Sequence, residues 1–238
     1  MKPTMTIVIP ALNEEANISA AVQEVLRVVE PRCSEYEILL FNDGSTDRTG
    51  SIMEDLARAN PKVRVFHNPS PRNTGAVFSQ GVEQARYEYI MMVPGDNENP
   101  AQALIAPIEA VGKADLVIAY TVNPEVRPLA RRIISRAYTT LLNLLFGLRL
   151  RYYNGTSIYR TKDLRRIRIG THSFGHLAER LIKLIKSGSS YWEVGVPIAA
   201  PRGRQSKAFR LKNLIGVGQT ILRLFYEVQL RGGWEASR

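Results

Sequence analysis

Short apolar runs alternate with longer amphipathic stretches along the first half of the chain. An apolar run that ends at Gly, Pro, Asn or Asp is typical of a buried strand, whereas apolar residues three or four apart are typical of a helix. The ranges predicted as strands are 5–9, 37–41, 63–66, 89–93 and 115–120. The ranges predicted as helices are 14–29, a segment that ends near 59, 75–86 and a segment that begins near 100. Asn13 is the predicted N-cap of the first helix, and Ser45 or Thr46 that of the second.

This alternation predicts an α/β fold, with a mostly parallel sheet covered by helices on both faces. In such sheets ligands bind beyond the carboxyl ends of the strands. Three polar turns directly follow predicted strands, at residues 11–15 (ALNEE), 42–47 (NDGSTD) and 94–99 (PGDNEN). We therefore expect these turns to share one edge of the sheet and to form a ligand site there.

A cationic helix is predicted over residues 127–146 of the second half. Leu129, Ile133, Ala137, Leu141 and Leu144 lie along one side of it. Its front is strongly cationic, and its back is apolar and ends at residues 144–147 (LLFG). An amphipathic core helix with a solvated arginine face is the alternative interpretation of the same pattern.

The remaining elements are a short strand, a helix, a further strand and a last amphipathic helix. Their predicted ranges are 157–159, 173–188, 191–197 and 211–230. The last helix can lie in a membrane interface or pack against the domain. We expect a domain over 1–209, with halves 1–120 and 121–209, followed by an amphipathic segment over 210–238.

The two halves differ strongly in charge. Residues 1–120 carry ten Lys or Arg against sixteen Asp or Glu, whereas residues 121–238 carry twenty-two against six. The first half suits a cation, and the second suits a polyanion such as anionic lipid or nucleic acid, or is a solvated basic face. A single cysteine, Cys33, excludes a disulfide framework and favours a reducing compartment. The sequence predicts neither a signal peptide nor a membrane-spanning run of about 18 apolar residues.

The motifs exclude the two common nucleotide-binding loops. No G-x-G-x-x-G follows the first strand, and no G-x-x-x-x-G-K-[ST] occurs. The chain instead has PALNEE at 10–15, NDGSTD at 42–47 and RNTG at 72–75. In order and spacing these motifs resemble family 2 glycosyltransferases with the GT-A (Rossmann-like) fold, and most closely their dolichyl/polyprenyl-phosphate mannose synthase-like branch. The resemblance covers residues 5–100 and continues more loosely to about 207.

The resemblance implies a nucleotide-diphosphate sugar as the donor. The residues that it assigns to donor binding are Pro10, Leu12, Glu14, Asp43, Ser45, Arg72, Gly75 and Asp96. Among them, Asp43 is expected at the rim of the site, where its carboxylate would accept hydrogen bonds from the base or the ribose. Taken alone, the Asp-Gly-Ser sequence is also typical of a tight turn with a helix cap.

The family usually carries Asp-x-Asp, often followed by Gln, where this chain has residues 93–100 (VPGDNENP). Aligned on the closing proline, Asp96 matches the second Asp and Glu98 matches the Gln, while Pro94 replaces the first Asp. The resemblance therefore implies Mg²⁺ or Mn²⁺ bound by Asp96 and Glu98, with Asp96 as the candidate catalytic residue. Two carboxylates plus the donor phosphates suffice for a hard divalent ion that keeps several waters. A metal-weak or inactive family member is the alternative.

The resemblance places the acceptor in the second half, where the polyprenyl-phosphate branch has an arginine- and serine-bearing segment and a basic R-x-x-G-x-S-K loop. The residues assigned to the acceptor phosphate are Arg127, Arg131, Arg132, Ser135, Ser206 and Lys207. Arg131 and Ser135 match the first segment directly. Arg151 stands where the family often has an acidic residue, just before Gly155. His172 and His176 have the spacing of a helical metal pair, but no third ligand is evident.

The predicted activity is inverting transfer of a hexose-like sugar to a polyprenyl phosphate, by a peripheral enzyme at the cytoplasmic face of a membrane. The enzyme would dock on the lipid or on a separate membrane protein. Orientation and charge stabilisation would carry most of the rate, since an ionised phosphate needs little help from a base. The alternatives are transfer to a glycolipid or polysaccharide hydroxyl, and a catalytically lapsed GT-A domain that binds anionic lipid or nucleic acid. An active enzyme is expected to bind no nucleic acid.

Overall fold

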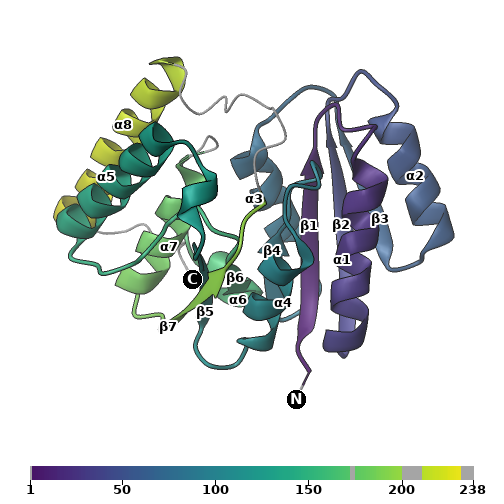
Figure 1. The fold of residues 1–238 in the computed structure, drawn as a ribbon, viewed down its shortest axis with the longest axis horizontal. Coiled ribbons are helices and arrows are strands. Elements are labelled where there is room, and N and C mark those ends of the chain that lie inside the picture. Colours follow the sequence, from purple (N-terminus) through teal and green to yellow (C-terminus); the bar gives the residue numbers. More distant parts are fainter. Residues whose placement is uncertain (1, 172–174, 200–210, 232–238) are drawn as a thin grey trace.

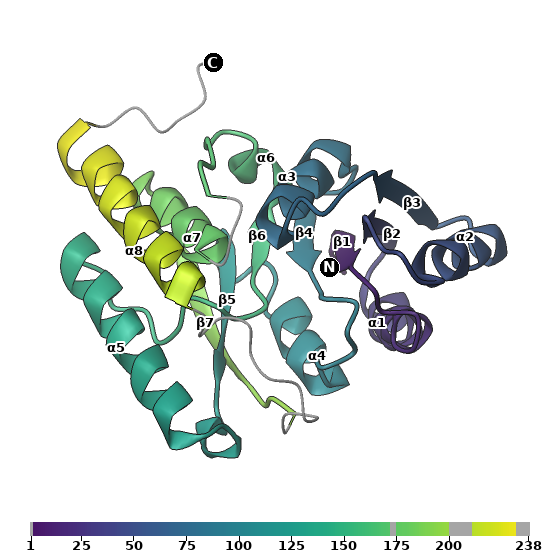
Figure 2. The same ribbon diagram turned by 90° about the horizontal axis from the view of Figure 1, so that it is seen from above.

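The computed structural model describes residues 2–171, 175–199 and 211–231, which form a seven-stranded sheet with helices on both faces (Figures 1 and 2). The strands are β1 (Thr4–Ala11), β2 (Glu35–Asp43), β3 (Val63–Asn68), β4 (Tyr89–Met92), β5 (Leu116–Thr121), β6 (Ile158–Arg160) and β7 (Tyr191–Val196). Their order across the sheet is β3-β2-β1-β4-β6-β5-β7. Only β6 is antiparallel to its neighbours among these strands, so the predicted mostly parallel α/β sheet is confirmed.

The helices cover the two faces of the sheet because the side chains of its strands alternate between them. Ile7 and Ile9 of β1 belong to one buried apolar cluster, whereas Val8 belongs to the other. The first face packs against α1 (Ile18–Arg32), α2 (Thr49–Ala59) and α4 (Ala101–Glu109). The second face packs against α3 (Thr74–Gln84), α5 (Leu129–Phe146), α6 (Thr161–Leu164), α7 (His176–Lys186) and α8 (Leu211–Phe225). A short 3-10 helix, η1 (Pro124–Val126), leads into α5, and a π-helical turn, η3 (Tyr226–Arg231), follows α8.

The predicted caps of the first two helices are wrong. Asn13 and Ser45 lie before the helices begin, and their polar groups bond to each other's turns instead. Asn13 has a left-handed backbone with φ of 57°, a conformation that asparagine tolerates better than most residues. These polar residues therefore connect two turns, which is a long-range role that a local capping pattern cannot reveal.

Helix α8 packs against the domain, beside α5 (Figure 2). Leu224 is buried, and Ile221, Phe225 and Val228 pack against the second apolar cluster. The Phe225 ring lies with its centroid 6.3 Å from that of Phe146 in α5. Of the two alternatives for this segment, packing against the domain is the one observed. No helix in the described ranges is long and apolar enough to cross a membrane.

A buried ion network fastens α8 and η3 to α7. Glu179 of α7 pairs with Lys183 at 2.7 Å and with Arg223 of α8 at 3.0 Å. Lys183 also pairs with Glu227, at 2.8 Å. Burial opposes ionisation of Glu179, but hydrogen bonds from the Gly170 amide and Lys183 hold the pKa of its carboxyl below the usual range. The two buried charges, Glu179 and Lys183, are therefore compensated by each other and by the partly exposed Arg223 and Glu227.

Candidate active site

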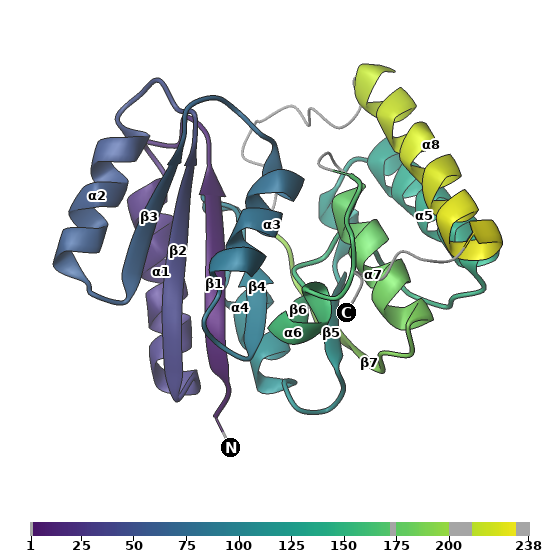
Figure 3. The same ribbon diagram turned by 180° about the vertical axis from the view of Figure 1, so that it is seen from behind.

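The polar turns predicted from the sequence share one edge of the sheet (Figures 1 and 3). We call residues 11–15 the first turn, 42–49 the second turn, 71–75 the third turn and 93–100 the acidic turn. The first, second and acidic turns follow β1, β2 and β4, which are parallel. Because β6 is antiparallel to both β4 and β5, the carboxyl end of β5 and the start of β6 also lie at this edge. The turns and these strand ends thus form a continuous rim.

The first and second turns are joined directly by hydrogen bonds. The Asn13 amide donates to Ser45 Oγ at 3.0 Å, and Asn13 Oδ1 accepts from the Thr46 amide at 2.9 Å. The Glu14 amide donates to Thr49 Oγ1 at 2.8 Å. Two turns that are far apart in the sequence therefore act as one rigid surface.

Asp47 strengthens this junction through a charged acceptor. Its carboxylate accepts from the Thr49 amide and hydroxyl and from the Glu15 amide. Although burial raises the pKa of Asp47, these hydrogen bonds outweigh that cost and hold its pKa below the usual value. The carboxylate remains ionised at neutral pH and fixes the entry to α2.

Asp43 is buried beneath the rim, so the prediction that it is a rim residue is wrong. Asp43 is only 5% exposed. Its carboxylate oxygens accept hydrogen bonds from Asn68 Nδ2 at 2.9 Å, the Arg72 amide at 2.9 Å and the Asn73 amide at 3.1 Å. A Cβ at Gly44 would lie 2.8 Å from backbone atoms of the 70–71 segment, so this close approach requires glycine. Asp43 and Gly44 together hold the third turn against the second.

The other predicted donor residues are distributed over this rim. Leu12 and Arg72 are exposed, and Glu14 and Ser45 are half-buried. Pro10 and Gly75 are buried, so they can contribute backbone shape but little side-chain surface. The structure thus brings the predicted donor residues to one edge of the sheet, with the Arg72 guanidinium as an exposed cation.

The acidic turn packs against the end of β1. The Gly95 amide donates to the Pro10 carbonyl at 3.0 Å, and a Cβ at Gly95 would lie 3.0 Å from the Ala11 Cβ. Asp96 Oδ1 accepts a hydrogen bond from the Glu98 amide at 3.2 Å, which bends the loop that carries both predicted metal ligands. Asp96 is half-buried and Glu98 is exposed.

The donor set of this turn fits Mg²⁺ or Mn²⁺ only as part of a complex. Both ions prefer oxygen ligands and keep several waters, and Mg²⁺ is usually bound by one or two carboxylates together with substrate phosphates. The described residues contain no group of three or more His, Cys, Asp or Glu placed to hold a metal. Asp96 and Glu98 therefore suit an ion whose remaining ligands come from a bound diphosphate and water.

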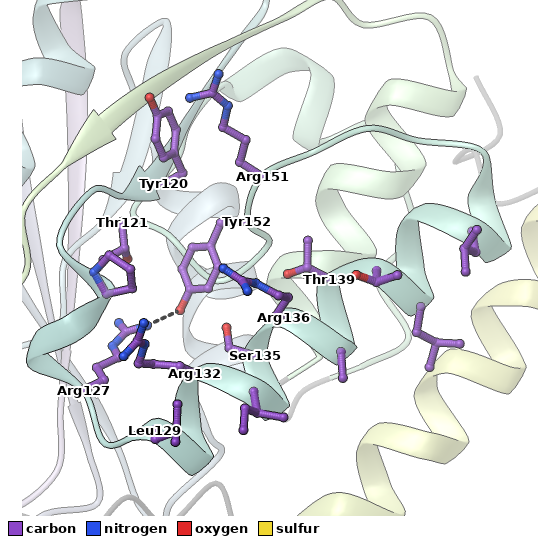
Figure 4. Close-up of a pocket in the computed structure, with 16 residues that line it drawn as sticks. Tyr120, Thr121, Arg127, Leu129, Arg132, Ser135, Arg136, Thr139, Arg151 and Tyr152 are labelled. Carbon is purple, nitrogen blue, oxygen red and sulfur yellow. Dashed lines mark hydrogen bonds between the residues drawn. The ribbon is translucent and has the colours of Figure 1, made fainter.

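A groove of about 770 Å³ begins at the carboxyl end of β5 and runs along α5 (Figure 4). Arg127, Arg132, Arg136 and Arg151 line it, and none of its described lining residues is acidic. Its remaining lining residues are Tyr120, Thr121, Pro124, Leu129, Ile133, Ser135, Ala137, Thr139, Thr140, Leu141, Leu144 and Tyr152. The groove combines cationic and apolar walls, which suits an amphiphilic anion.

Two tyrosines orient arginines in this groove. Arg127 Nη1 donates to Tyr152 Oη at 3.1 Å, and Arg151 lies 4.5 Å from the centroid of the Tyr120 ring (Figure 4). Aromatic rings attract guanidinium groups through their π faces. Among the residues that the structure describes, no ion pair to a carboxylate involves either guanidinium, although the Arg151 backbone amide donates to Glu193 Oε1 at 2.7 Å.

The structure changes the predicted set of acceptor residues. Arg127, Arg132 and Ser135 line the groove as predicted, whereas Arg131 is not among its lining residues. Arg136 was missed, although it follows Arg132 by four residues, the spacing at which two side chains share a helix face. Ser206 and Lys207 lie outside the residues that the structure describes.

The apolar residues predicted along one side of α5 do share a side, but that side is exposed and does not face the core. Leu129, Ile133 and Leu144 are 64%, 59% and 77% exposed, and they line the same groove as the arginines. The helix is held instead through Leu142 and Phe146, which are buried. In an ordinary core helix the apolar side would be buried and the arginine side solvated. Here the apolar residues are exposed beside the arginines, so this alternative interpretation does not hold.

His176 takes part in a buried contact instead of a metal pair. It is nearly inaccessible, and its Nδ1 lies 2.7 Å from Arg180 Nη1. His172 lies outside the described residues.

Comparison with protein families identifies this combination of fold and turns. Residues 6–168 match the model of Glycosyl transferase family 2. The chain belongs to this family. It is therefore a glycosyltransferase of family 2, as the motifs predicted.

Similar curated proteins include several polyprenyl-phosphate sugar transferases. Polyprenol monophosphomannose synthase of Mycolicibacterium smegmatis is 29% identical over 70% of this chain and 66% of its own length. Undecaprenyl-phosphate mannosyltransferase of Micrococcus luteus is 27% identical over 84% of this chain and 85% of its own. Dolichyl-phosphate beta-glucosyltransferase ALG5C of Trichomonas vaginalis is 35% identical over 38% of this chain, which spans only 28% of that protein. These names agree with the branch that the motifs resemble.

Solved structures of glycosyltransferases share the fold. Glucosyl-3-phosphoglycerate synthase from Mycobacterium tuberculosis, in complex with Mg²⁺ and uridine diphosphate, has a TM-score of 0.66 at 18% identity, covering 94% of this chain and 78% of that one. Its complex with Mn²⁺, uridine diphosphate and glucosyl-3-phosphoglycerate has a TM-score of 0.64 at 19% identity, covering 94% and 79%. At this identity the likeness concerns the fold, which is the predicted GT-A fold.

Proposed function

We propose that this family 2 glycosyltransferase moves a hexose-like sugar from a nucleotide diphosphate to a polyprenyl phosphate, with inversion, at the cytoplasmic face of a membrane. The observation that carries the proposal is the order of features along the sheet edge. The first, second and third turns lie on one side of the acidic turn, and the arginine groove lies on the other. In this proposal Asp96 would lie between the donor site and the acceptor site.

The three joined turns would bind the nucleotide. Leu12 would offer exposed apolar surface, the half-buried Ser45 would offer its hydroxyl, and the exposed Arg72 would supply a positive charge for the phosphates. Asp96 and Glu98 would hold Mg²⁺ or Mn²⁺, which, when bound, neutralises charge on the departing diphosphate. Because the turns are fixed by internal hydrogen bonds, the site is organised before the donor arrives.

The groove would bind the acceptor. Arg127, Arg132 and Arg136 can neutralise a phosphate monoester, and Ser135 can donate a hydrogen bond to it. Leu129 and Leu144 offer apolar surface to the first units of an isoprenoid chain. The names of the polyprenyl-phosphate relatives support this assignment.

The chemical step needs little proton transfer. An ionised oxygen of the acceptor phosphate attacks the anomeric carbon of the sugar from the face opposite the nucleotide. The bond between that carbon and the diphosphate oxygen breaks, and the nucleoside diphosphate leaves with the electron pair. The attacking oxygen carries no proton, so no general base is required. Asp96 would therefore assist by holding the metal ion and not by accepting a proton.

The exposed apolar row of α5 favours a peripheral position on a membrane. Leu129, Ile133 and Leu144 can enter the lipid interface while Arg132 and Arg136 meet anionic headgroups. Alternatively, a separate membrane protein could cover the same exposed residues of α5. Either would bring a lipid-linked phosphate directly to the mouth of the groove.

The decisive test is a binding screen with two ligands. Thermal stabilisation by UDP-, GDP- or dTDP-sugars with Mn²⁺ tests the donor site, and titration with a short-chain polyprenyl phosphate tests the groove. We expect Arg132→Glu and Arg136→Glu to abolish binding of the lipid phosphate while the donor response stays intact.

Arg131→Glu is the matched control, because Arg131 precedes Arg132 on the same helix but does not line the groove. Equal losses in all three variants would show that general surface charge, and not the groove, binds the lipid. Stabilisation by anionic lipid alone, with no response to any metal–nucleotide pair, would contradict the proposal and favour a lapsed domain.

A further inference from the structure

The third turn is held in a different way from the first two. The first and second turns bond directly to each other, whereas the amides of Arg72 and Asn73 donate to the buried Asp43 carboxylate. Asn73 has φ of 70° and ψ of 154°, an unfavourable conformation for a residue with a side chain. Such strain persists only where the surroundings hold the backbone firmly. The third turn therefore depends on whatever fixes the helix that follows it.

A buried arginine from the acceptor half grips the first turns of that helix. Arg180 of α7 donates through Nη2 to the Gly75 carbonyl at 3.2 Å and to Ser79 Oγ at 2.8 Å. Its guanidinium also lies 4.8 Å from the centroid of the Phe78 ring. Gly75, Phe78 and Ser79 all belong to the first half of α3. One side chain thus joins two helices more than a hundred residues apart in sequence.

Burying the charged Arg180 side chain costs free energy. It is 1% exposed, and its Nη1 contacts His176 through the ring Nδ1 at 2.7 Å and the carbonyl at 3.1 Å. Within the described residues its hydrogen bonds reach carbonyl, hydroxyl and imidazole groups but no carboxylate. Burial lowers the pKa of Arg180 to about 10. A buried cation without a bonded anion costs free energy that ordinary packing does not require.

The neighbouring residues of α7 face a different partner. Glu179 and Lys183 belong to the ion network that fastens α8, whereas Arg180 faces α3. The two contacts of α7 can therefore be broken separately. A loss of helix packing in general would affect both, but a loss of Arg180 would release α3 in particular.

We propose that Arg180 is a positioning residue for the donor site: by holding the Gly75 carbonyl and Ser79, it fixes the first turn of α3 and with it the backbone at Arg72 and Asn73. This inference rests on the proposed function for the identity of the donor. The negative charge of Asp43 secures the turn from β2, and the positive charge of Arg180 secures it from α7. The acceptor half thereby sets the geometry of the donor rim.

The first test needs no ligand. Hydrogen–deuterium exchange is measured on the full chain for the parent, Arg180→Lys, Ser79→Ala and the control Lys183→Met. We expect Arg180→Lys and Ser79→Ala to raise amide exchange over residues 72–79, because each removes a contact to α3. Lys183→Met should raise exchange over residues 211–231 instead. Ser79→Ala leaves the buried cation in place, so it serves even if the arginine variant folds poorly.

The second test measures the dissociation constants of the Mn²⁺–UDP, Mn²⁺–GDP and Mn²⁺–dTDP complexes at a temperature where every variant is folded. Loss of a hydrogen bond that positions the site should weaken binding by about tenfold in Arg180→Lys. Lys183→Met, although destabilised, should bind like the parent. Affinity that falls equally in both variants, or exchange in Arg180→Lys that rises only within α7, would overturn the inference. A parent that binds no metal–nucleotide pair refutes the proposed donor, while the exchange data still decide the role of Arg180.

Discussion

Replacement of Asp43 by alanine should destabilise the protein substantially, in contrast to the small effect expected of an exposed ligand-binding residue. The substitution removes the acceptor of the Arg72 and Asn73 amides and one of the two acceptors of Asn68 Nδ2, which keeps its bond to Gln80 Oε1. An unsatisfied buried donor costs about 1–3 kcal/mol, and water can reach part of this site, so we expect a total loss of about 3–5 kcal/mol. This is a large fraction of the roughly 5–15 kcal/mol that stabilises a typical domain.

The assay is urea unfolding of the parent, Asp43→Ala, Asp43→Asn and the control Asp55→Ala. Asp43→Asn keeps the shape but offers one acceptor oxygen in place of two, so its loss should lie between those of the parent and the alanine variant. Asp55 is an exposed residue of α2 paired with Arg58, and its removal should change the unfolding free energy by less than about 0.5 kcal/mol. An Asp43→Ala protein that unfolds at the parent's midpoint with the same urea dependence would refute the structural role. The carboxylate would then be available to a nucleotide, as the sequence motif predicted.

Three other substitutions test separate features. Gly155→Ala places a Cβ 1.9 Å from the Ala119 carbonyl oxygen, so we expect a loss of about 3 kcal/mol or more in thermal unfolding; a parent-like melting temperature would show that this approach is not close. Glu98→Gln should weaken Mn²⁺ affinity by about tenfold in the presence of a nucleoside diphosphate, since one of two carboxylate charges is lost; unchanged affinity would make Glu98 a solvated loop residue. Hydrogen bonds from Ser190 and the nearby Arg160 charge lower the pKa of Asp115, so its stabilisation is present above the ordinary pKa of about 4 and disappears as the pH falls through the lower folded value. Asp115→Asn should therefore reduce stability by about 1–2 kcal/mol at pH 7 and by less as the pH falls through that lower folded value, and a pH-independent difference would contradict this origin.

The fold could be predicted from the sequence because its signals are local. Buried strands contain continuous apolar runs, such as 38–41, and the helices between them have clear helical spacing. The side of α5 that faces the core could not be predicted in this way. Periodicity shows that Leu129 and Leu144 share a side of the helix, but not whether that side is buried. The packing of Leu142 and Phe146 decides that question, and it depends on α7 and α8.

The candidate site was predicted in part for the same reason. The three turns follow strands, so their meeting at one edge follows from parallel pairing alone. The buried position of Asp43 depends on the path of the third turn, which lies some thirty residues along the chain. Arg136 and Arg151 reach the groove from α5 and from the segment before β6, a juxtaposition that only the tertiary structure creates.

The antiparallel β6 has a consequence for the order in which the chain folds. The first four strands can pair as soon as residue 92 has been synthesised, but β4 keeps an open edge until residues 158–160 arrive to cover it. β5 is made earlier than β6, yet among the described strands it pairs with β6 and β7 alone, so neither of these partners is available during synthesis of α5. An unpaired strand edge can pair with wrong partners, and the nascent chain is therefore vulnerable while α5, with its exposed Leu129, Ile133 and Leu144, is synthesised. Slow translation between residues 121 and 158 would lengthen that interval. A chaperone that shields β4 and β5 would prevent their open edges from pairing with wrong partners.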